Sequence, residues 1–147
     1  MPPSTAPAAL SWIATSPWAY PALEVVHILG VALLLGNLVA LELRVWGAAG
    51  ELPVAALARL SLGLALTGFA LAAGSGLLMF ASQPLELLAN RSFVLKLGLL
   101  ALAGLNAALF HARGGLGRLD ALARIQTLVS LGLWIGAIIA GRWIAYA

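Results

Sequence analysis

The fold of this chain is decided by residues 21–46, PALEVVHILGVALLLGNLVALELRVW. This stretch is almost wholly apolar and exceeds the about 20 residues that a helix needs to cross a bilayer. Pro21 suits the first turn of a helix, and the glycine-containing residues 47–50 end it. Three stretches of the same character follow, at about residues 54–82, 92–112 and 122–146. With short connections between them, they predict an all-α membrane protein, a four-transmembrane-helix up-down-up-down bundle.

The composition agrees with a protein that lies in lipid. Of the 147 residues, 63% are hydrophobic and 9% charged, whereas soluble domains carry about 25% charged residues. The net charge of +3 comes from Lys and Arg at the ends of the spans, so it reports orientation in a membrane and not nucleic-acid binding. The absence of cysteine excludes disulfides, thiolate metal sites and iron–sulfur clusters.

Two domains are predicted, an N-terminal interfacial segment over residues 1–20 and a four-helix transmembrane domain over residues 21–147. The first has no Lys or Arg, so we expect no cleaved signal peptide. Its stretch from Ala8 to Trp18 mixes large apolar with small or hydroxyl residues. This mixture favours a short helix lying in the membrane interface.

The basic residues divide unevenly between the two predicted membrane faces. The face with the first and third connections carries five of them, and the other face carries three. Because Lys and Arg concentrate on the cytoplasmic side, we expect both termini to face outward. The five are Arg44, Arg59, Arg113, Arg118 and Arg124, and the three are Arg91, Lys96 and Arg142.

Small residues recur at four-residue spacing in three of the predicted helices, and such stripes let helices approach closely in lipid. We expect most to pack within the chain, and Gly132 and Gly136 form the best candidate face for a homo-oligomer. The stripes are Gly68, Ala72 and Gly76, then Gly104, Ala108 and Ala112, and then Gly132, Gly136 and Ala140.

The first predicted helix holds most of the polar residues that should lie in the membrane. Gly30, Asn37 and Arg44 are seven apart and share a face with His27, so we expect this face to point inward. Glu24 precedes His27 by three residues, a spacing that suits a hydrogen bond to the imidazole or half of a Glu-x-x-His metal site. Intramembrane ionisable groups are costly and therefore point to function.

The second histidine, His111, lies near the end of the third predicted helix. Its depth differs from that of His27 by about 19 Å at 1.5 Å per residue, too far for both to bind one iron within one subunit. If His27 binds haem, Met79 at a similar depth or a histidine of a second subunit would complete the ligation. An interior hydrogen-bonded histidine is the alternative for His27, and anchoring at the membrane boundary is the alternative for His111.

Two basic residues, Lys96 and Arg142, lie one turn inside the outward ends of their helices. Either they extend to the lipid headgroups, or they form a cluster around His27 with Glu24, Glu86 and Arg91. Such a cluster would hold a quinone, a haem propionate or an anionic substrate. We expect Asn37, Asn106 and Gln126 to make hydrogen bonds between helices.

Several motifs together resemble a family of short bacterial four-helix inner-membrane proteins of unknown function, over nearly the whole chain. The resemblance implies the bacterial inner membrane, so that the outward termini expected from the basic residues would be periplasmic, and it marks His27, Arg44, Lys96, Asn106, His111 and Arg142 as family positions. More distantly the pattern is similar to copper-resistance D-type proteins and to transmembrane b-type cytochromes, although two histidines replace the four of a dihaem protein. The motifs are EVVHILG from Glu24, LELRVWG from Leu41, SGLLMF from Ser75, FVLK from Phe93, LNAALFH from Leu105 and GRWIAY from Gly141.

Three kinds of function fit these residues. The first is a b-type haem protein that transfers electrons, with His27 as a ligand. The second is a subunit that handles a metal or a small solute at Glu24 and His27. The third is an accessory subunit, without cofactor, of a larger membrane complex. Because no nucleophile lies beside a base, we expect no enzyme activity beyond electron transfer.

Overall fold

The computed structural model describes residues 9–147, all of whose regular elements are helices. Four helices of the described chain are long and apolar enough to cross a membrane. The elements are α1 (Ser11–Thr15), α2 (Ala19–Val45), α3 (Val54–Ser82), α4 (Pro84–Ala89), α5 (Arg91–Ala112), α6 (Gly115–Arg118), α7 (Ala121–Trp143) and the 3₁₀ turn η1 (Ile144–Tyr146).

The four long helices begin and end within about three residues of the predicted spans. The differences lie in the connections, because two segments expected as irregular chain form the short helices α4 and α6. Pro84 follows the end of α3 and occupies the first turn of α4, where its missing N–H costs nothing. At the other end, Gly114 adopts φ +71°, which a glycine tolerates without strain.

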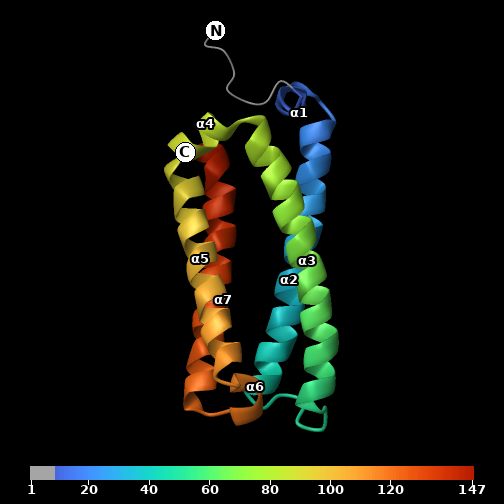
Figure 1. Cartoon of the computed structure of the whole chain (residues 1–147), viewed down its shortest axis with the longest axis vertical. Coiled ribbons are helices and arrows are strands. Elements are labelled where there is room, and N and C mark those ends of the chain that lie inside the picture. Colours follow the sequence, from blue (N-terminus) through green and yellow to red (C-terminus); the bar gives the residue numbers. More distant parts are fainter. Residues whose placement is uncertain (1–8) are drawn as a thin grey trace.

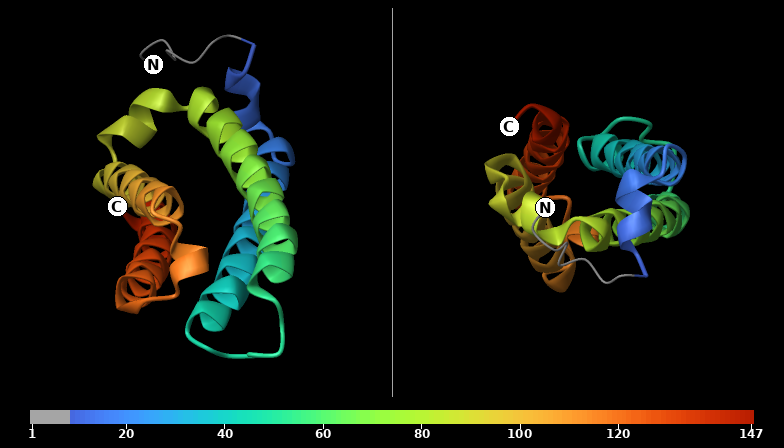
Figure 2. Two further views of the ribbon diagram at one scale, coloured as in Figure 1. Left: turned by 60° about the horizontal axis from the view of Figure 1, so that its bottom comes forward. Right: turned by 90° about the horizontal axis from the view of Figure 1, so that it is seen from above.

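The long helices form two pairs. Helix α2 packs chiefly against α3, and α5 packs chiefly against α7. Figure 1 shows the two pairs side by side, with α1, α4 and the end of the chain at one end and α6 at the other. The views in Figure 2 show the same division from above and from an oblique angle. For brevity, the end with α1 and α4 is called the α4 end, and the opposite end is called the α6 end.

Two glycines set the closest approach in the molecule. A Cβ atom on Gly68 of α3 would lie 2.6 Å from both the Gly30 oxygen and the Leu34 nitrogen of α2. Reciprocally, a Cβ atom on Gly30 would lie 2.6 Å from the Ala72 nitrogen. Only glycine allows these backbones to touch, so the predicted packing role of the Gly68 stripe is confirmed.

The other two stripes of small residues behave differently. Gly104, Ala108 and Ala112 are exposed, so the expectation of internal packing is wrong for this stripe. Helix α5 instead buries Ala103 and Phe110, because these residues face α7 and the end of α2. In α7 a Cβ atom on Gly136 would meet the Leu99 side chain of α5 at 3.3 Å.

The two pairs meet most firmly at the α6 end. Val45 of α2, Phe110 of α5 and Ala123 of α7 form a buried cluster. Beside it, the indole N–H of Trp46 donates a 2.9 Å hydrogen bond to the Thr127 hydroxyl. This bond and the apolar cluster fix the end of α2 against α7.

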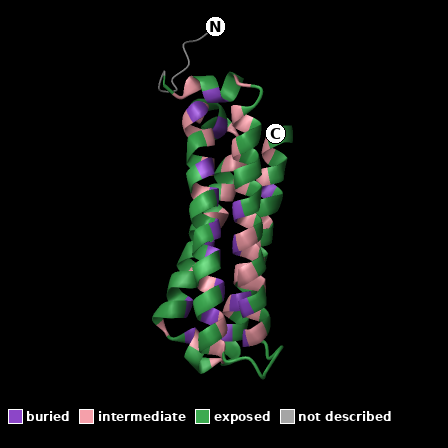
Figure 3. Cartoon of the chain, turned by 90° about the vertical axis from the view of Figure 1, so that its right-hand side faces the viewer, coloured by how far each residue is buried: buried purple, intermediate pink, exposed green. Residues whose placement is uncertain are grey.

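Much of the outer face of the helices is exposed (Figure 3), and large apolar side chains are among the exposed residues. Leu66 of α3 is 68% exposed, and Ile28 of α2 is 64% exposed. Soluble monomers rarely expose such extensive apolar surface. These faces suit contact with lipid chains.

The N-terminal part of the described chain contains a five-residue helix within the predicted interfacial segment. Ile13 is buried, and α1 lies against α3. Trp12 and Trp18 are exposed. Residues 1–8 of the predicted segment lie outside the described residues.

Candidate functional site

His27 lies on the inner face of α2 near the α4 end, where all four long helices contribute to its surroundings. A Cβ atom on Gly76 of α3 would lie 3.3 Å from the Cε1 atom of the imidazole. The absence of a side chain at Gly76 therefore makes room for the ring. The stripe that packs α3 against α2 thus also positions the histidine.

The hydrogen bonds of His27 define its tautomer. Its Nδ1 atom lies 2.8 Å from the Ala72 carbonyl oxygen, which can only accept, so Nδ1 carries a proton and donates it. The Ser75 hydroxyl, which donates to the Leu71 carbonyl at 2.6 Å, lies 3.3 Å from the same nitrogen. In a neutral imidazole this arrangement leaves the lone pair on Nε2. A histidine held in this way presents Nε2 to a ligand, as metal-binding histidines commonly do.

Lys96 of α5 approaches that lone pair. Its Nζ atom lies 3.4 Å from His27 Nε2 and can donate a long hydrogen bond to it. From the other side, a Cβ atom on Gly141 of α7 would lie 3.3 Å from Nζ. The ammonium group is therefore enclosed between α2, α5 and α7, and the side chain is only partly exposed. We call His27, Lys96 and Ser75 the His27 site.

No carboxylate of residues 9–147 pairs with Lys96, because the one ion pair in that range joins Arg113 to Asp120. Arg113 and Asp120 lie outside the long helices. Their hydrogen bond, together with the backbone N–H of Ala123, lowers the pKa of Asp120 to about 2. The same hydrogen bond raises the pKa of Arg113.

The larger cluster predicted around His27 is not formed. Glu24 is exposed, and the Ala72 carbonyl, not Glu24, holds the imidazole, because residue 24 points outward from α2. Arg142 is also exposed and donates to the Tyr146 hydroxyl at 2.7 Å. Glu86 and Arg91 lie exposed at the α4 end. Of the cluster, only Lys96 reaches His27.

The two histidines lie at opposite ends of the molecule. His111 is exposed near the α6 end, where it lines a cavity and stands edge-on to the Phe110 ring. Met79 is partly buried on α3, one turn beyond Ser75. Within the described residues, no three His, Cys, Asp or Glu side chains gather as a metal site would require.

The remaining predicted polar residues serve the local structure. Arg44 donates to the Leu52 and Gly50 carbonyls of the connection after α2, at 2.8 and 3.3 Å. Asn37 donates to the Leu33 carbonyl of its own helix, so the expected bond between helices is wrong there. Asn106 does link two helices, since its amide donates to the Gln126 carbonyl of α7 at 2.8 Å.

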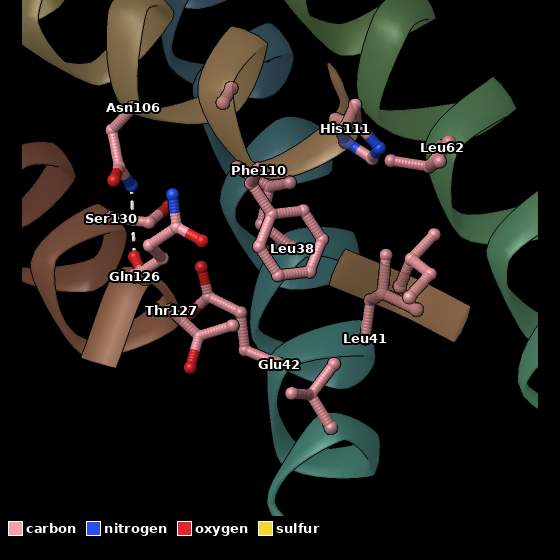
Figure 4. Close-up of a pocket in the computed structure, with 13 residues that line it drawn as sticks. Leu38, Leu41, Glu42, Leu62, Asn106, Phe110, His111, Gln126, Thr127 and Ser130 are labelled. Atoms are coloured by element: carbon pink, nitrogen blue, oxygen red, sulfur yellow. Dashed lines mark hydrogen bonds between the residues drawn. The ribbon is translucent and has the colours of Figure 1, made fainter. Parts of the chain in front are cut away.

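The α6 end contains a second polar region that the sequence did not single out. Glu42 of α2 lines a cavity that also includes Asn106, Gln126 and Ser130 (Figure 4). The available signal was a carboxylate inside an apolar span. The sequence alone does not show that this carboxylate borders a cavity, which several helices form together. Ser75 was overlooked because serine is common in such helices.

The predicted oligomer face on α7 is only partly free. Gly132 has open space where a side chain would be, whereas Gly136 faces Leu99 of the same chain. Homo-oligomer formation through this face stays a prediction.

Comparison with protein-family models, with curated proteins and with solved structures finds no match. The fold and the sites therefore carry the functional argument by themselves.

Proposed function

We propose that this chain is a multi-pass protein of the bacterial inner membrane that binds an anionic ligand or cofactor at the His27 site. It crosses the membrane four times in an up-down-up-down course. The greater number of arginines at the α6 end favours that end as cytoplasmic, with periplasmic termini.

The observation that carries this proposal is the unpaired ammonium of Lys96. Its one recorded polar neighbour is the Nε2 atom of a histidine at 3.4 Å. A partly buried charge without a partner is costly, and near a lipid phase the cost rises because water is scarce. A carboxylate or phosphate group of a ligand would supply the missing charge, and the remaining ammonium protons would bind its oxygens.

The exposed fractions favour ligand binding over a simple headgroup contact. Arg142 behaves as a boundary residue, because it is exposed and bonded to Tyr146. Lys96 instead turns inward toward α2 and α7. The two basic residues therefore have different roles, although both lie near the same end.

A second candidate, b-type haem, is favoured by the tautomer of His27. The Ala72 carbonyl fixes the proton on Nδ1, so Nε2 is the nitrogen that would bind iron. Lys96 would then move aside on its flexible stem and hold a propionate of the same cofactor. Haem when bound would supply one-electron chemistry, and Met79 or a second copy of the chain would have to supply the other ligand.

The test is the small-molecule content of the protein purified in mild detergent. Organic extracts of the wild-type protein, Lys96→Met and Arg142→Ala are compared by mass spectrometry. We expect an acidic compound with the wild-type protein and with Arg142→Ala, and a loss of at least tenfold with Lys96→Met. Equal content in all three proteins would contradict the proposal.

Visible spectra of the same samples, oxidised and then reduced with dithionite, identify the cofactor. A Soret band that disappears in His27→Ala would show that the ligand is haem. A colourless wild-type sample with an acidic compound in the extract would exclude haem and retain the anionic ligand.

A further inference from the structure

The cavity at the α6 end lies between α2, α5 and α7, with Leu62 of α3 on its wall. Figure 4 shows Asn106, Gln126, Thr127 and Ser130 on one side of the cavity, and His111 beside Leu62 on the opposite side. Its volume is about 50 Å³, which is room for an ion or a few water molecules. A cofactor as large as haem does not fit there.

Glu42 contributes the carboxyl group of this cavity, and no arginine is among the residues that line it. Arg44 donates to loop carbonyls, and Arg113 donates to Asp120 and to the Gln126 side chain. Arg124 lies over the Trp46 ring, 5.8 Å from its centre. In the part of the chain that the structure describes, Glu42 therefore has no ion-pair partner.

The polar groups beside Glu42 offer mainly oxygen atoms. The Ser130 hydroxyl lines the cavity together with the Glu42 carboxyl group. The Asn106 amide nitrogen is used on the Gln126 carbonyl, so its side-chain oxygen is left for another partner. The Thr127 hydroxyl donates to the Arg124 carbonyl at 2.7 Å and accepts from the Trp46 indole N–H at 2.9 Å, which leaves one oxygen lone pair. These groups come from three helices and converge on one small space.

We propose that this cavity, which we call the Glu42 cavity, binds Na⁺. Oxygen ligands select hard cations, and one carboxylate balances one positive charge. Divalent cations such as Ca²⁺ usually take several carboxylates and six to eight oxygens, whereas Glu42 is the one carboxylate that lines the cavity. The proposal is independent of the ligand at the His27 site, which lies about 22 Å away along α2 at 1.5 Å per residue.

The experiment is thermal unfolding of the full chain in detergent at pH 8, with NaCl increasing and choline chloride decreasing at constant ionic strength. Constant ionic strength removes the general screening effect of salt. A cation that binds only the folded protein raises the unfolding temperature as its concentration rises. We expect a saturable increase for the wild-type protein and for the control Glu51→Gln, which changes an exposed glutamate in the connection after α2.

We expect Glu42→Gln to lose the Na⁺-dependent increase and Ser130→Ala to require about tenfold more Na⁺. Ser130→Ala keeps the carboxylate, so it provides the comparison if Glu42→Gln does not fold. Lys96→Met should keep the full response, which separates failure at one site from failure at the other.

Three outcomes would overturn the assignment. One is the same unfolding temperature in NaCl and choline chloride, which would mean that the carboxyl group holds a proton. Another is an equal response to KCl. The third is an unchanged Na⁺ response in both Glu42→Gln and Ser130→Ala.

Discussion

The two ends of the molecule hold the two helix pairs together through different contacts. At the α6 end, apolar packing and the Trp46–Thr127 bond join the two helix pairs, while the Arg113–Asp120 pair links the end of α5 to the start of α7. At the α4 end, the polar contact between the pairs is the long Lys96–His27 approach. The helix pairs are therefore joined mainly at the α6 end, whereas at the α4 end the Lys96 ammonium has no ion-pair partner among the described residues.

The comparison also concerns the charges that each end leaves without a partner. Among the described residues, the Lys96 side chain at the α4 end and the Glu42 side chain at the α6 end have no ion-pair partner. They lie at opposite ends of the apolar helices, so they cannot neutralise each other. Lys96 and Glu42 form no ion pair that stabilises the described part of the fold. For this reason we assign both groups to ligands.

The largest effect on the free energy of unfolding is expected at the contact between α2 and α3, the helix pair that positions His27. Gly68→Ala would bring a Cβ atom within 2.6 Å of the α2 backbone. We expect it to lower the free energy of unfolding by about 3 kcal/mol, since backbone atoms cannot move aside cheaply. Unfolding by SDS titration in detergent micelles measures this change.

The matched control is Gly63→Ala in the same helix, where a Cβ atom would have open space. Alanine favours helix more than glycine by about 1 kcal/mol, so this variant should be slightly more stable than the wild-type protein. Equal effects of the two substitutions would show that the Gly30–Gly68 contact is not the point at which the pair is fixed.

A smaller effect concerns the ion pair at the α6 end. The pKa of Asp120 is about 2 in the folded protein, below the ordinary value of about 3.9 in the unfolded chain. The pair therefore stabilises the fold fully above about pH 5, and this contribution is lost as the pH falls toward 2. We expect the unfolding temperature of the wild-type protein to decline over this range more than that of Asp120→Asn.

Asparagine keeps the side-chain oxygen that accepts from the Ala123 N–H at the start of α7, so the substitution removes the charge and retains the cap. Because the pair is exposed, the difference between the two proteins should be small. Parallel pH profiles would contradict this account of the α6 end.

The sequence predicts the helices well but only part of the sites. Long apolar runs, Pro84 and the glycines after α2 and α5 place the helix ends, because these signals are local. His27 lies near the start of α2 and His111 near the end of α5, so the helix lengths also place the two histidines at different depths. Ligand contacts depend on helix rotation, which a hydropathy pattern does not determine. For that reason Glu24 was expected beside His27, while the Ala72 carbonyl lies there instead.

The pairing of the helices could not be predicted either. Stripes of small residues occur in α3, α5 and α7, and the sequence does not distinguish those that pack from those that face lipid. Gly68 meets α2, whereas Gly104 has open space around it. Glu42 was overlooked because its importance depends on a cavity that several helices form together.

The central claim is that Lys96 and Glu42 are unpaired charges held for ligands. The most direct measurement is a double-mutant cycle of Lys96→Met and Glu42→Gln, by SDS titration of protein stripped of bound small molecules in choline chloride. We predict that each substitution leaves the free energy of unfolding unchanged or raises it, and that the two effects add within about 0.5 kcal/mol. A loss of about 3–5 kcal/mol in either single variant, as when a buried ion pair is broken, would contradict the account.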